Sequence, residues 1–268
     1  MNKYREQYGW KLIYFDGFAG SGSRAESLLE ADSPLMKDLF DDDALSPQEL
    51  SIYKGSAERV LSIPQRGFDC YCFIDKDQVS SNMLKERLSK FKTSHKLIFR
   101  NSDANHQVKI IAEAMKKDCR YASLVFLDPF GMQVNWDAIK ELQNTRTDLW
   151  ILIPTGVIVN RLLDRKGKLE HIDKLKTFFG KDEEFLRNYF YTTNTERTLF
   201  GDVEIIQKVG MPIQKIAELY INQLKTVFKH VTEKPKVLYN TRNTPIFHFA
   251  FASNNATAKK IANQIIQK

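Results

Sequence analysis

Five short apolar runs, separated by stretches with a helical pattern, constrain the fold of this chain more than any other feature. The runs are apolar throughout rather than alternating, which is typical of strands buried on both faces of a parallel sheet. They cover residues 12–15, 70–74, 97–99, 124–127 and 149–153. Strands that alternate with helices predict a doubly wound α/β sheet, and ligands of such sheets bind at the carboxyl ends of the strands.

Two segments interrupt this alternation. Residues 24–66 are too long for an ordinary strand-to-strand crossover, so we expect a helix plus an insert after the first strand. Residues 156–236 carry helical apolar stripes, and the runs at 237–239 and 246–251 read as two closing strands joined in an antiparallel hairpin. No repeat or linker divides the chain, which predicts a single domain over 1–268 with a basic helical insertion at 156–236.

The composition narrows the class of protein. With 43% hydrophobic residues the chain is too apolar for a disordered protein. No apolar run approaches the roughly 20 residues of a membrane-spanning helix. The three cysteines (Cys70, Cys72 and Cys119) lie in apolar segments, and we expect reduced thiols in a cytoplasmic protein. Cys70 and Cys72 share one face of a strand, and we expect them to be buried small hydrophobes rather than ligands. The five histidines have no metal-ligand spacing with Cys or Asp, so no metal site is expected.

A glycine-rich loop, Asp-Gly-Phe-Ala-Gly-Ser-Gly at residues 16–22, follows the first predicted strand. Such a loop lets the backbone approach a ligand closely, and no Gly-Lys-(Ser/Thr) follows it, which argues against a P-loop NTPase. Two ligand classes remain. Gly20-x-Gly22-x-x-Ala25 matches a dinucleotide fingerprint, but the acid expected about 20 residues later follows no strand. The alternative is S-adenosylmethionine, whose cationic groups favour the carboxylate of Asp16.

Acidic residues follow the second and third predicted strands. Asp75 could accept both ribose hydroxyls of an adenosine, although it could also cap the next helix, a role for which Asp77 competes. Asp103 could accept the exocyclic amine of adenine or act as a simple helix N-cap, and both alternatives stay open.

Asp128-Pro129-Phe130 follows the fourth predicted strand, at the centre of such a sheet. A carboxylate and a proline carbonyl present two acceptors in a fixed geometry, because proline restricts φ. The neighbouring aromatic ring could stack on a planar substrate. This combination suits an amino-bearing base or amide whose nitrogen attacks an electrophilic methyl group.

These motifs together resemble the three-Cys-motif partner proteins, a class I methyltransferase-like family named for a neighbouring-gene partner with three cysteines. The resemblance covers most of the chain and lies in residues 16–22, 54–56, 73–76, 102–105, 127–131 and 239–253. It implies a Rossmann-like class I methyltransferase fold, with a seven-stranded mostly parallel sheet, an antiparallel last strand and a helical insertion. It also implies binding of S-adenosyl-L-methionine by Asp16, Gly17, Phe18, Ala19, Gly20, Gly22, Asp75, Lys76, Asp103 and Ala104.

The same resemblance implies catalysis at Asp128, Pro129 and Phe130, and a three-Cys-motif protein as a possible partner. Asp128-Pro129-Phe130 is also similar to the (Asp/Asn)-Pro-Pro-(Tyr/Phe) loop of amino-group methyltransferases on DNA and RNA. This chain lacks the second proline, which shifts the aromatic residue by one position. The departure favours the alternative of a methyltransferase-like binding subunit with weak or lost catalysis.

The net charge of +7 is confined to one part of the chain. Residues 1–155 carry 21 basic and 22 acidic residues, whereas residues 156–268 carry 19 and 11. A basic C-terminal part predicts an anionic partner, with DNA or RNA as the expected substrate. The candidate substrate contacts are Arg161, Arg165, Lys166 and Lys168, for which a solvated helix face is the alternative. We therefore expect a methyltransferase acting on a nucleic-acid amino nitrogen; an NAD-dependent oxidoreductase is a further alternative.

Overall fold

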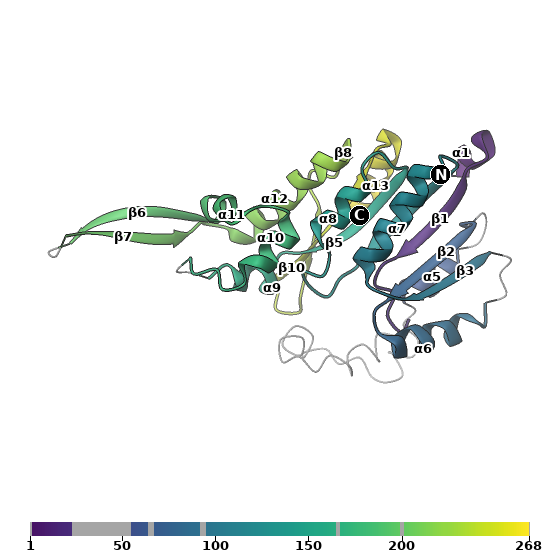
Figure 1. The fold of residues 1–268 in the computed structure, drawn as a ribbon, viewed down its shortest axis with the longest axis horizontal. Coiled ribbons are helices and arrows are strands. Elements are labelled where there is room, and N and C mark those ends of the chain that lie inside the picture. Colours follow the sequence, from purple (N-terminus) through teal and green to yellow (C-terminus); the bar gives the residue numbers. More distant parts are fainter. Residues whose placement is uncertain are drawn as a thin grey trace.

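A single large β-sheet forms the centre of the molecule (Figure 1). The structure is a computed structural model that describes residues 2–22, 55–63, 67–91, 95–164, 167–198 and 201–267. The strands of the sheet are β1 (Lys11–Asp16), β2 (Cys70–Asp75), β3 (Lys96–Asn101), β4 (Tyr121–Leu127), β5 (Thr147–Pro154), β8 (His230–Val231), β9 (Lys236–Tyr239) and β10 (Pro245–Ser253). All five predicted parallel strands are present.

The order of the strands defines the fold. Along the sheet they run β3-β2-β1-β4-β5-β10-β8, with β9 paired to β10. β1 to β5 are mutually parallel, whereas β10 is antiparallel to its three neighbours β5, β8 and β9. This order, with one reversed strand next to β5, is that of the Rossmann-like class I methyltransferase fold, and the predicted fold class is confirmed. The sheet has eight strands rather than the expected seven, because β9 pairs with β10 in addition to the strands in this order.

Helices cover both faces of the sheet, which explains why the strands are apolar throughout. The helices outside the insertion are α1 (Asn2–Tyr8), α5 (Ser56–Leu61), α6 (Gln78–Leu88), α7 (Ala104–Lys117), α8 (Trp136–Glu141) and α13 (Ala256–Ile266). On one face Phe15 and Val125 pack with Ile111 of α7 in the larger core cluster. On the other, Tyr14 packs with Leu84 of α6. Successive residues of each strand thus enter different cores.

The insertion predicted at 156–236 is not helical throughout. It contains α9 (Val157–Leu162), α10 (Ile172–Phe179), α11 (Glu183–Phe190) and α12 (Pro212–Val227), but also the antiparallel pair β6 (Tyr191–Thr198) and β7 (Gly201–Lys208). These two strands form an arm that projects away from the body (Figure 1). The prediction missed them because most of the described side chains of the ribbon are exposed, and β6 is rich in threonine, so its sequence lacks the apolar run of a core strand.

The base of the arm is attached to α9 through one lysine. The Lys208 Nζ donates to the carbonyl oxygen of Asn160 at 2.7 Å and to the Asn160 side-chain oxygen at 2.6 Å. It also donates to the carbonyl oxygen of Leu163 at 2.5 Å. A cation in this position satisfies carbonyl groups at the C-terminal end of a helix.

The structure confirms some of the other predictions for residues 24–66 and for the C-terminal part of the chain, and leaves others untested. The closing hairpin is present as β9 and β10, and the final helix as α13, but β8 was not predicted because two residues are too short for a pattern. The predicted insert at 24–66 lies largely outside the described residues, which include only 55–63 of it. None of the helices in the described ranges has the length and apolar composition that a bilayer crossing requires.

Gly180, in the insertion, packs against Trp136 of the sheet domain, and this contact can be tested by substitution. It ends α10 with φ +62°, and a Cβ there would lie 2.0 Å from the Trp136 ring at the start of α8. Gly9 has φ +63° with no heavy atom within 4 Å of its virtual Cβ. We expect Gly9→Ala to cost about 1–2 kcal/mol for the backbone alone, and Gly180→Ala about 2–5 kcal/mol. Urea unfolding of both variants measures the difference; equal costs would contradict this packing.

Candidate active site

The carboxyl ends of the parallel strands bring three of the predicted acidic residues to one edge of the sheet. Asp16 ends β1, Asp75 ends β2, and Asp128 directly follows β4. In the register of the sheet, Asp16 lies opposite Phe73 and Phe126. Asp75 and Asp128 therefore each stand two positions beyond Asp16 along their own strands. Three adjacent strands, β2, β1 and β4, therefore each contribute one carboxyl group to the predicted ligand-binding edge.

The glycine-rich loop is held between the two strands that flank β1. The Gly17 N–H donates to the carbonyl oxygen of Phe126 at 3.0 Å, and the Ala19 N–H donates to that of Ile74 at 2.9 Å. The Gly20 N–H donates to the Asp75 carboxylate at 2.8 Å. These bonds fix the loop as a turn over the end of the sheet rather than as a free connection.

A second glycine from far along the chain is required at this turn. The Cα of Gly55 faces the loop so closely that a Cβ would lie 2.9 Å from the backbone oxygen of Gly22. Gly22 itself has φ +77°, a conformation that L side chains rarely adopt. Only two residues without side chains can meet in this way. The contact places Ser56, the first residue of α5, beneath the loop.

The Asp16 carboxyl group is completely buried under the loop. It accepts hydrogen bonds from the Ser56 hydroxyl at 2.8 Å, the Phe18 N–H at 3.2 Å and the Tyr14 hydroxyl at 3.4 Å. Burial raises its pKa to about 6, and the negative charge of Asp128 acts in the same direction, whereas the three hydrogen bonds lower it. A rise from 3.8 to about 6 favours the neutral form by about 3 kcal/mol. A cationic ligand group would reverse this preference.

Tyr14 and Ser56 were not predicted as site residues. The pKa of Tyr14 is raised well above its usual value by burial and by the nearby Asp16. Ser56 belongs to the Lys-Gly-Ser motif at 54–56, which was noted in the sequence without a role for its hydroxyl. Only the fold brings this serine to a residue 40 positions earlier in the chain.

The Asp75 carboxylate is half-buried and accepts from two backbone groups. One oxygen accepts from the Gly20 N–H and the other from the Asp77 N–H, both at 2.8 Å. A carboxylate has about four acceptor positions, so it can accept further hydrogen bonds. Asp77, not Asp75, caps α6 by accepting from the Ser80 N–H. The competing N-cap interpretation of Asp75 is therefore wrong, which leaves its ribose role as a prediction.

Asp103 acts as the N-cap of α7. One carboxylate oxygen accepts from the Asn105 N–H at 2.9 Å and from the His106 N–H at 3.3 Å. This is one of the two roles expected for it, and its contact with adenine stays a prediction. Ala104 is buried beside Gly17, and Lys76 is exposed, with its carbonyl oxygen accepting from the Asn101 side chain.

The loop after β4 has a buried and an exposed part. Pro129 is buried, whereas the Phe130 ring is 52% exposed. Asp128 opens to solvent on one side, yet the protein surrounding its carboxyl group raises the pKa to about 6 through lost solvation. Asp128 can therefore exchange a proton near neutral pH, and Phe130 offers an accessible aromatic surface beside it.

Asn105 holds this loop in place, a role the sequence did not reveal. Its side-chain nitrogen donates to the carbonyl oxygen of Gln133 at 2.8 Å, and its side-chain oxygen accepts from the Asn135 N–H at 2.7 Å. The Gln133 side chain in turn accepts from the Phe130 N–H at 3.2 Å. The start of α7 thus positions the loop that carries Asp128. Asn105 lies two residues after Asp103 in the motif at 102–105, but nothing in that motif indicates which backbone groups it reaches.

The predicted substrate contacts are only partly described. Arg161 is exposed on α9, which begins just after β5 at the same edge of the sheet, and Lys168 is exposed in the loop that follows. Arg165 and Lys166 lie outside the described residues. Arg242, exposed in the turn between β9 and β10, is a further cation that was not predicted. This turn also lies at the carboxyl edge, since Phe247 pairs with Pro154 at the end of β5.

Comparisons with known proteins add little to this geometry. No family model matches the chain, and no curated protein matches it. One solved structure to which the chain is similar is described as "Putative methyltransferase yhhF from Escherichia coli". The similarity has a TM-score of 0.28 and 14% identity, and covers 77% of this chain and 81% of that chain. Similarity at this level carries no argument about function, so the fold assignment rests on the order and direction of the strands.

Removal of the Ser56 hydroxyl tests the electrostatics of Asp16. Alanine is a good helix former, so Ser56→Ala removes the donor with little effect on α5. The hydroxyl stabilises the ionised carboxylate, and we expect its loss to raise the pKa of Asp16 further above 6. Carbon-13 NMR titration of labelled aspartate carboxyl groups measures this pKa, with Asp16→Asn to assign the resonance. Ser62→Ala, at the other end of α5, is the control; an unchanged Asp16 pKa in Ser56→Ala would contradict the assignment.

Proposed function

We propose that this protein is a methyltransferase that uses S-adenosylmethionine and acts on an amino nitrogen of a nucleic acid. The observation that carries the proposal is the buried Asp16 carboxyl group beneath a glycine-rich turn at the end of β1. The methyltransferase-like fold supports it, because this fold places Asp16, Asp75 and Asp128 at one edge. Among the described residues, the hydrogen-bond partners of Asp16 are all neutral, and the proposed cofactor carries two positive groups.

The residues present fit the cofactor. Asp16 would bind its ammonium group, since the three described hydrogen-bond partners of this carboxyl are neutral and leave its charge without compensation. Asp75 would accept the ribose hydroxyls with its remaining acceptor positions. Asp103 would accept the adenine amine, and Gly17, Phe18, Ala19, Gly20, Gly22, Lys76 and Ala104 would line the same site. When bound, the cofactor supplies an electrophilic methyl group.

Asp128 and Pro129 would orient the acceptor nitrogen. The Asp128 carboxylate and the Pro129 carbonyl oxygen offer two acceptors for an amino group, which would direct its lone pair away from them. A pKa of about 6 leaves Asp128 mostly ionised at neutral pH and basic enough to take up a proton as positive charge develops on nitrogen. Phe130 would stack on the planar base, and its exposure leaves the ring accessible.

The nucleic-acid part of the proposal rests on the charge distribution. Arg161, Arg165, Lys166 and Lys168 would contact phosphates beside the site, together with Arg242. The resemblance to the three-Cys-motif partner proteins also leads us to propose a protein of that class as a partner. The alternative, a methyltransferase-like binding subunit without efficient catalysis, is favoured by the single proline after Asp128.

Calorimetry with S-adenosylhomocysteine tests the cofactor. Asp16→Asn should weaken binding by tenfold or more, since a charge-assisted hydrogen bond contributes roughly 1.5–3 kcal/mol. Because Asp16 ionises near pH 6 and the ligand's ammonium group favours the ionised form, affinity in wild type should fall as the pH drops from 7.5 to 5. Asp173→Asn, an exposed carboxylate on α10, is the control. Preference for NAD, or Asp16→Asn binding like wild type, would refute the cofactor assignment.

Transfer of radiolabelled methyl groups into separated DNA, RNA and protein fractions tests the reaction. Asp128→Ala should reduce transfer by about 100-fold or more, the range expected for a general base, while binding of S-adenosylhomocysteine stays within about twofold of wild type. Lys260→Glu, an exposed change on α13 away from this edge, should leave transfer unchanged. Cofactor binding by wild type without labelling of any fraction would support the binding-subunit alternative, and labelling of protein alone would refute the nucleic-acid substrate.

A further inference from the structure

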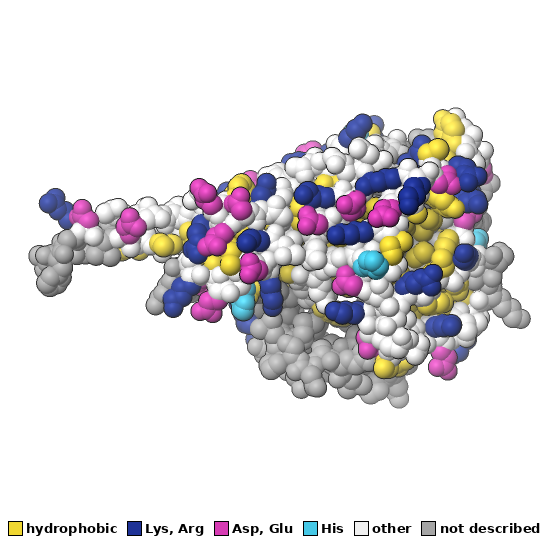
Figure 2. Space-filling model, in the orientation of Figure 1, with side chains coloured by type: hydrophobic (Ala, Val, Ile, Leu, Met, Phe, Trp, Pro, Cys, Tyr) yellow, Lys and Arg dark blue, Asp and Glu magenta, His cyan; other side chains and the backbone are white. Residues whose placement is uncertain are grey.

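A groove on the sheet face shared by β1, β2 and β3 plays no part in the proposed reaction. It has a volume of about 580 Å³ and runs between these strands and α7. Its apolar floor includes Ile13, Phe15 and Ile98, and α7 contributes only uncharged side chains to it, Gln107, Ile110, Ile111 and Ala114. In Figure 2 apolar side chains gather on this side of the molecule, with Lys and Arg side chains beside them. The groove is open to solvent and large enough for a peptide-sized molecule.

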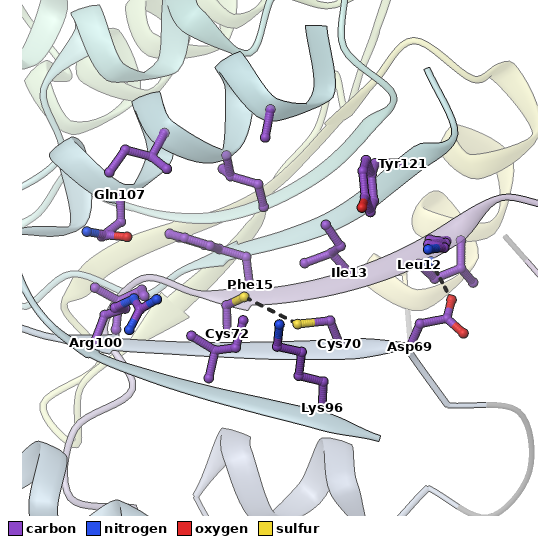
Figure 3. A pocket seen from close by; sticks show the side chains of 16 residues that line it. Leu12, Ile13, Phe15, Asp69, Cys70, Cys72, Lys96, Arg100, Gln107 and Tyr121 are labelled. Atoms are coloured by element: carbon purple, nitrogen blue, oxygen red, sulfur yellow. Dashed lines mark hydrogen bonds between the residues drawn. The ribbon is translucent and has the colours of Figure 1, made fainter. Parts of the chain in front are cut away.

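Two thiols lie side by side in this groove. Cys70 and Cys72 are two positions apart on β2, so both side chains point to the same face, and their sulfur atoms are 3.8 Å apart (Figure 3). Both are half-buried rather than fully buried, which corrects the expectation that these two thiols are buried, and Cys119 is exposed. Cys70 begins β2 and Asp75 ends it, so the thiols lie at the opposite end of the strand from the candidate active site.

The charged groups around the thiols are predominantly basic. Lys96 on β3 pairs with Cys70 in the sheet, and its amino group is directed toward the two sulfur atoms in Figure 3. Arg100 on β3 and Lys11 on β1 also line the groove. Asp69 is the single acidic residue among the described residues of the lining, and its carboxylate already accepts from the Leu12 N–H at 2.6 Å and from Arg5 at 2.9 Å. The groove therefore favours a ligand with negative charge.

This environment activates one thiol of the pair. The two sulfur atoms share a hydrogen bond in which either thiol can donate. With Cys72 as the donor, this bond and the charge of Lys96 lower the pKa of Cys70 to about 7, against the opposing effects of burial and Asp69. The pKa of Cys72 is then raised. Because the thiolate is the nucleophile, a lowered pKa makes Cys70 the more reactive thiol of the pair.

We propose that Cys70 is a site of reversible S-thiolation by a small, carboxylate-bearing disulfide that binds in this groove. The Cys70 thiolate attacks one sulfur of the disulfide, a new S–S bond forms to Cys70, and the S–S bond of the reagent breaks. The leaving group departs as a thiolate with the electron pair, so Cys70 is oxidised and one half of the reagent is reduced. Attack by a second thiol reverses the step. The basic groups attract the carboxylates of the reagent, and the apolar floor accommodates its body.

Thiol chemistry fits the pair better than metal binding. Among the described residues, no group of three or more His, Cys, Asp and Glu side chains is placed to hold a metal ion, whereas a closed structural zinc site needs four ligands. The activity of the dithiol is independent of the proposed methyltransferase reaction, so failure of one proposal leaves the other intact.

The first experiment compares the three cysteines of the wild-type protein. The protein is incubated with oxidised glutathione, quenched with acid, and digested for mass spectrometry of each cysteine peptide. Cys119 is the most exposed thiol, so accessibility alone would make it react first. We expect Cys70 to be modified roughly tenfold faster than Cys119, since a larger fraction of it is thiolate. Faster modification of Cys119, or equal rates, would overturn the proposal.

The second experiment separates charge attraction from thiol reactivity. Wild type is treated with anionic oxidised glutathione and with cationic cystamine, and Lys96→Gln is treated in the same way. We expect Cys70 to prefer the anionic reagent, and this preference to fall severalfold in Lys96→Gln at 50 mM salt. Lys260→Gln, outside the groove, should keep the wild-type preference. The same preference in Lys96→Gln as in wild type would refute the role of the groove.

The third experiment tests the contribution of Cys72. Cys72→Ala should slow modification of Cys70, and Cys72→Ser, which keeps a hydroxyl donor, should restore part of the rate. The far-UV spectrum and thermal unfolding check that each variant is folded. Cys70 reacting equally fast in wild type and in folded Cys72→Ala would contradict the activated pair. If Cys72→Ala does not fold, the wild-type comparisons above still decide the proposal.

Discussion

The loss of solvation of one carboxyl group, that of Asp16, is the interaction on which the carboxyl edge of the sheet depends. The last residue of a central parallel strand is shielded from water, because neighbouring strands and helices cover it. The neighbouring groups therefore act as substitutes for water: a backbone N–H of the glycine-rich turn, the Ser56 hydroxyl and the Tyr14 hydroxyl. The Ser56 hydroxyl can reach Asp16 only if the start of α5 lies against the glycine-rich turn. Gly55 therefore packs directly against Gly22.

The parts of this arrangement that the sequence revealed are those that follow from burial and from strand direction. Apolar runs identify β1 to β5, and parallel strands necessarily gather Asp16, Asp75 and Asp128 at one edge. Ser56 could not be found in this way, since no local pattern says which distant hydroxyl will reach Asp16. Asn105 was equally hidden, because it acts on the loop after β4 through hydrogen bonds to the backbone of Gln133 and Asn135. Contacts between segments that are remote in sequence depend on the completed fold.

The structure shows which elements carry the excess of basic residues in the C-terminal part of the chain. The β6–β7 arm is not basic, since Arg197 and Lys208 are outnumbered by Glu196, Asp202 and Glu204. From residue 211 onward the chain carries nine basic and two acidic residues, so most of the positive excess follows the arm in the sequence. The sequence cluster at 161–168 supplies few of these charges. At the carboxyl edge, the described cations include Arg161 of α9 and Arg242 of the β9–β10 turn, so they come from two elements rather than from one helix.

The anchoring of the arm by Lys208 has a mechanical consequence. A two-stranded ribbon that leaves the body has no neighbouring strand to resist bending, and its base is its firmest point. At this base, the Lys208 ammonium group donates hydrogen bonds to the carbonyl oxygens of Asn160 and Leu163. These carbonyl groups lie at the end of α9, the helix that bears Arg161. Bending of the arm at its base would therefore act on α9 through these three hydrogen bonds.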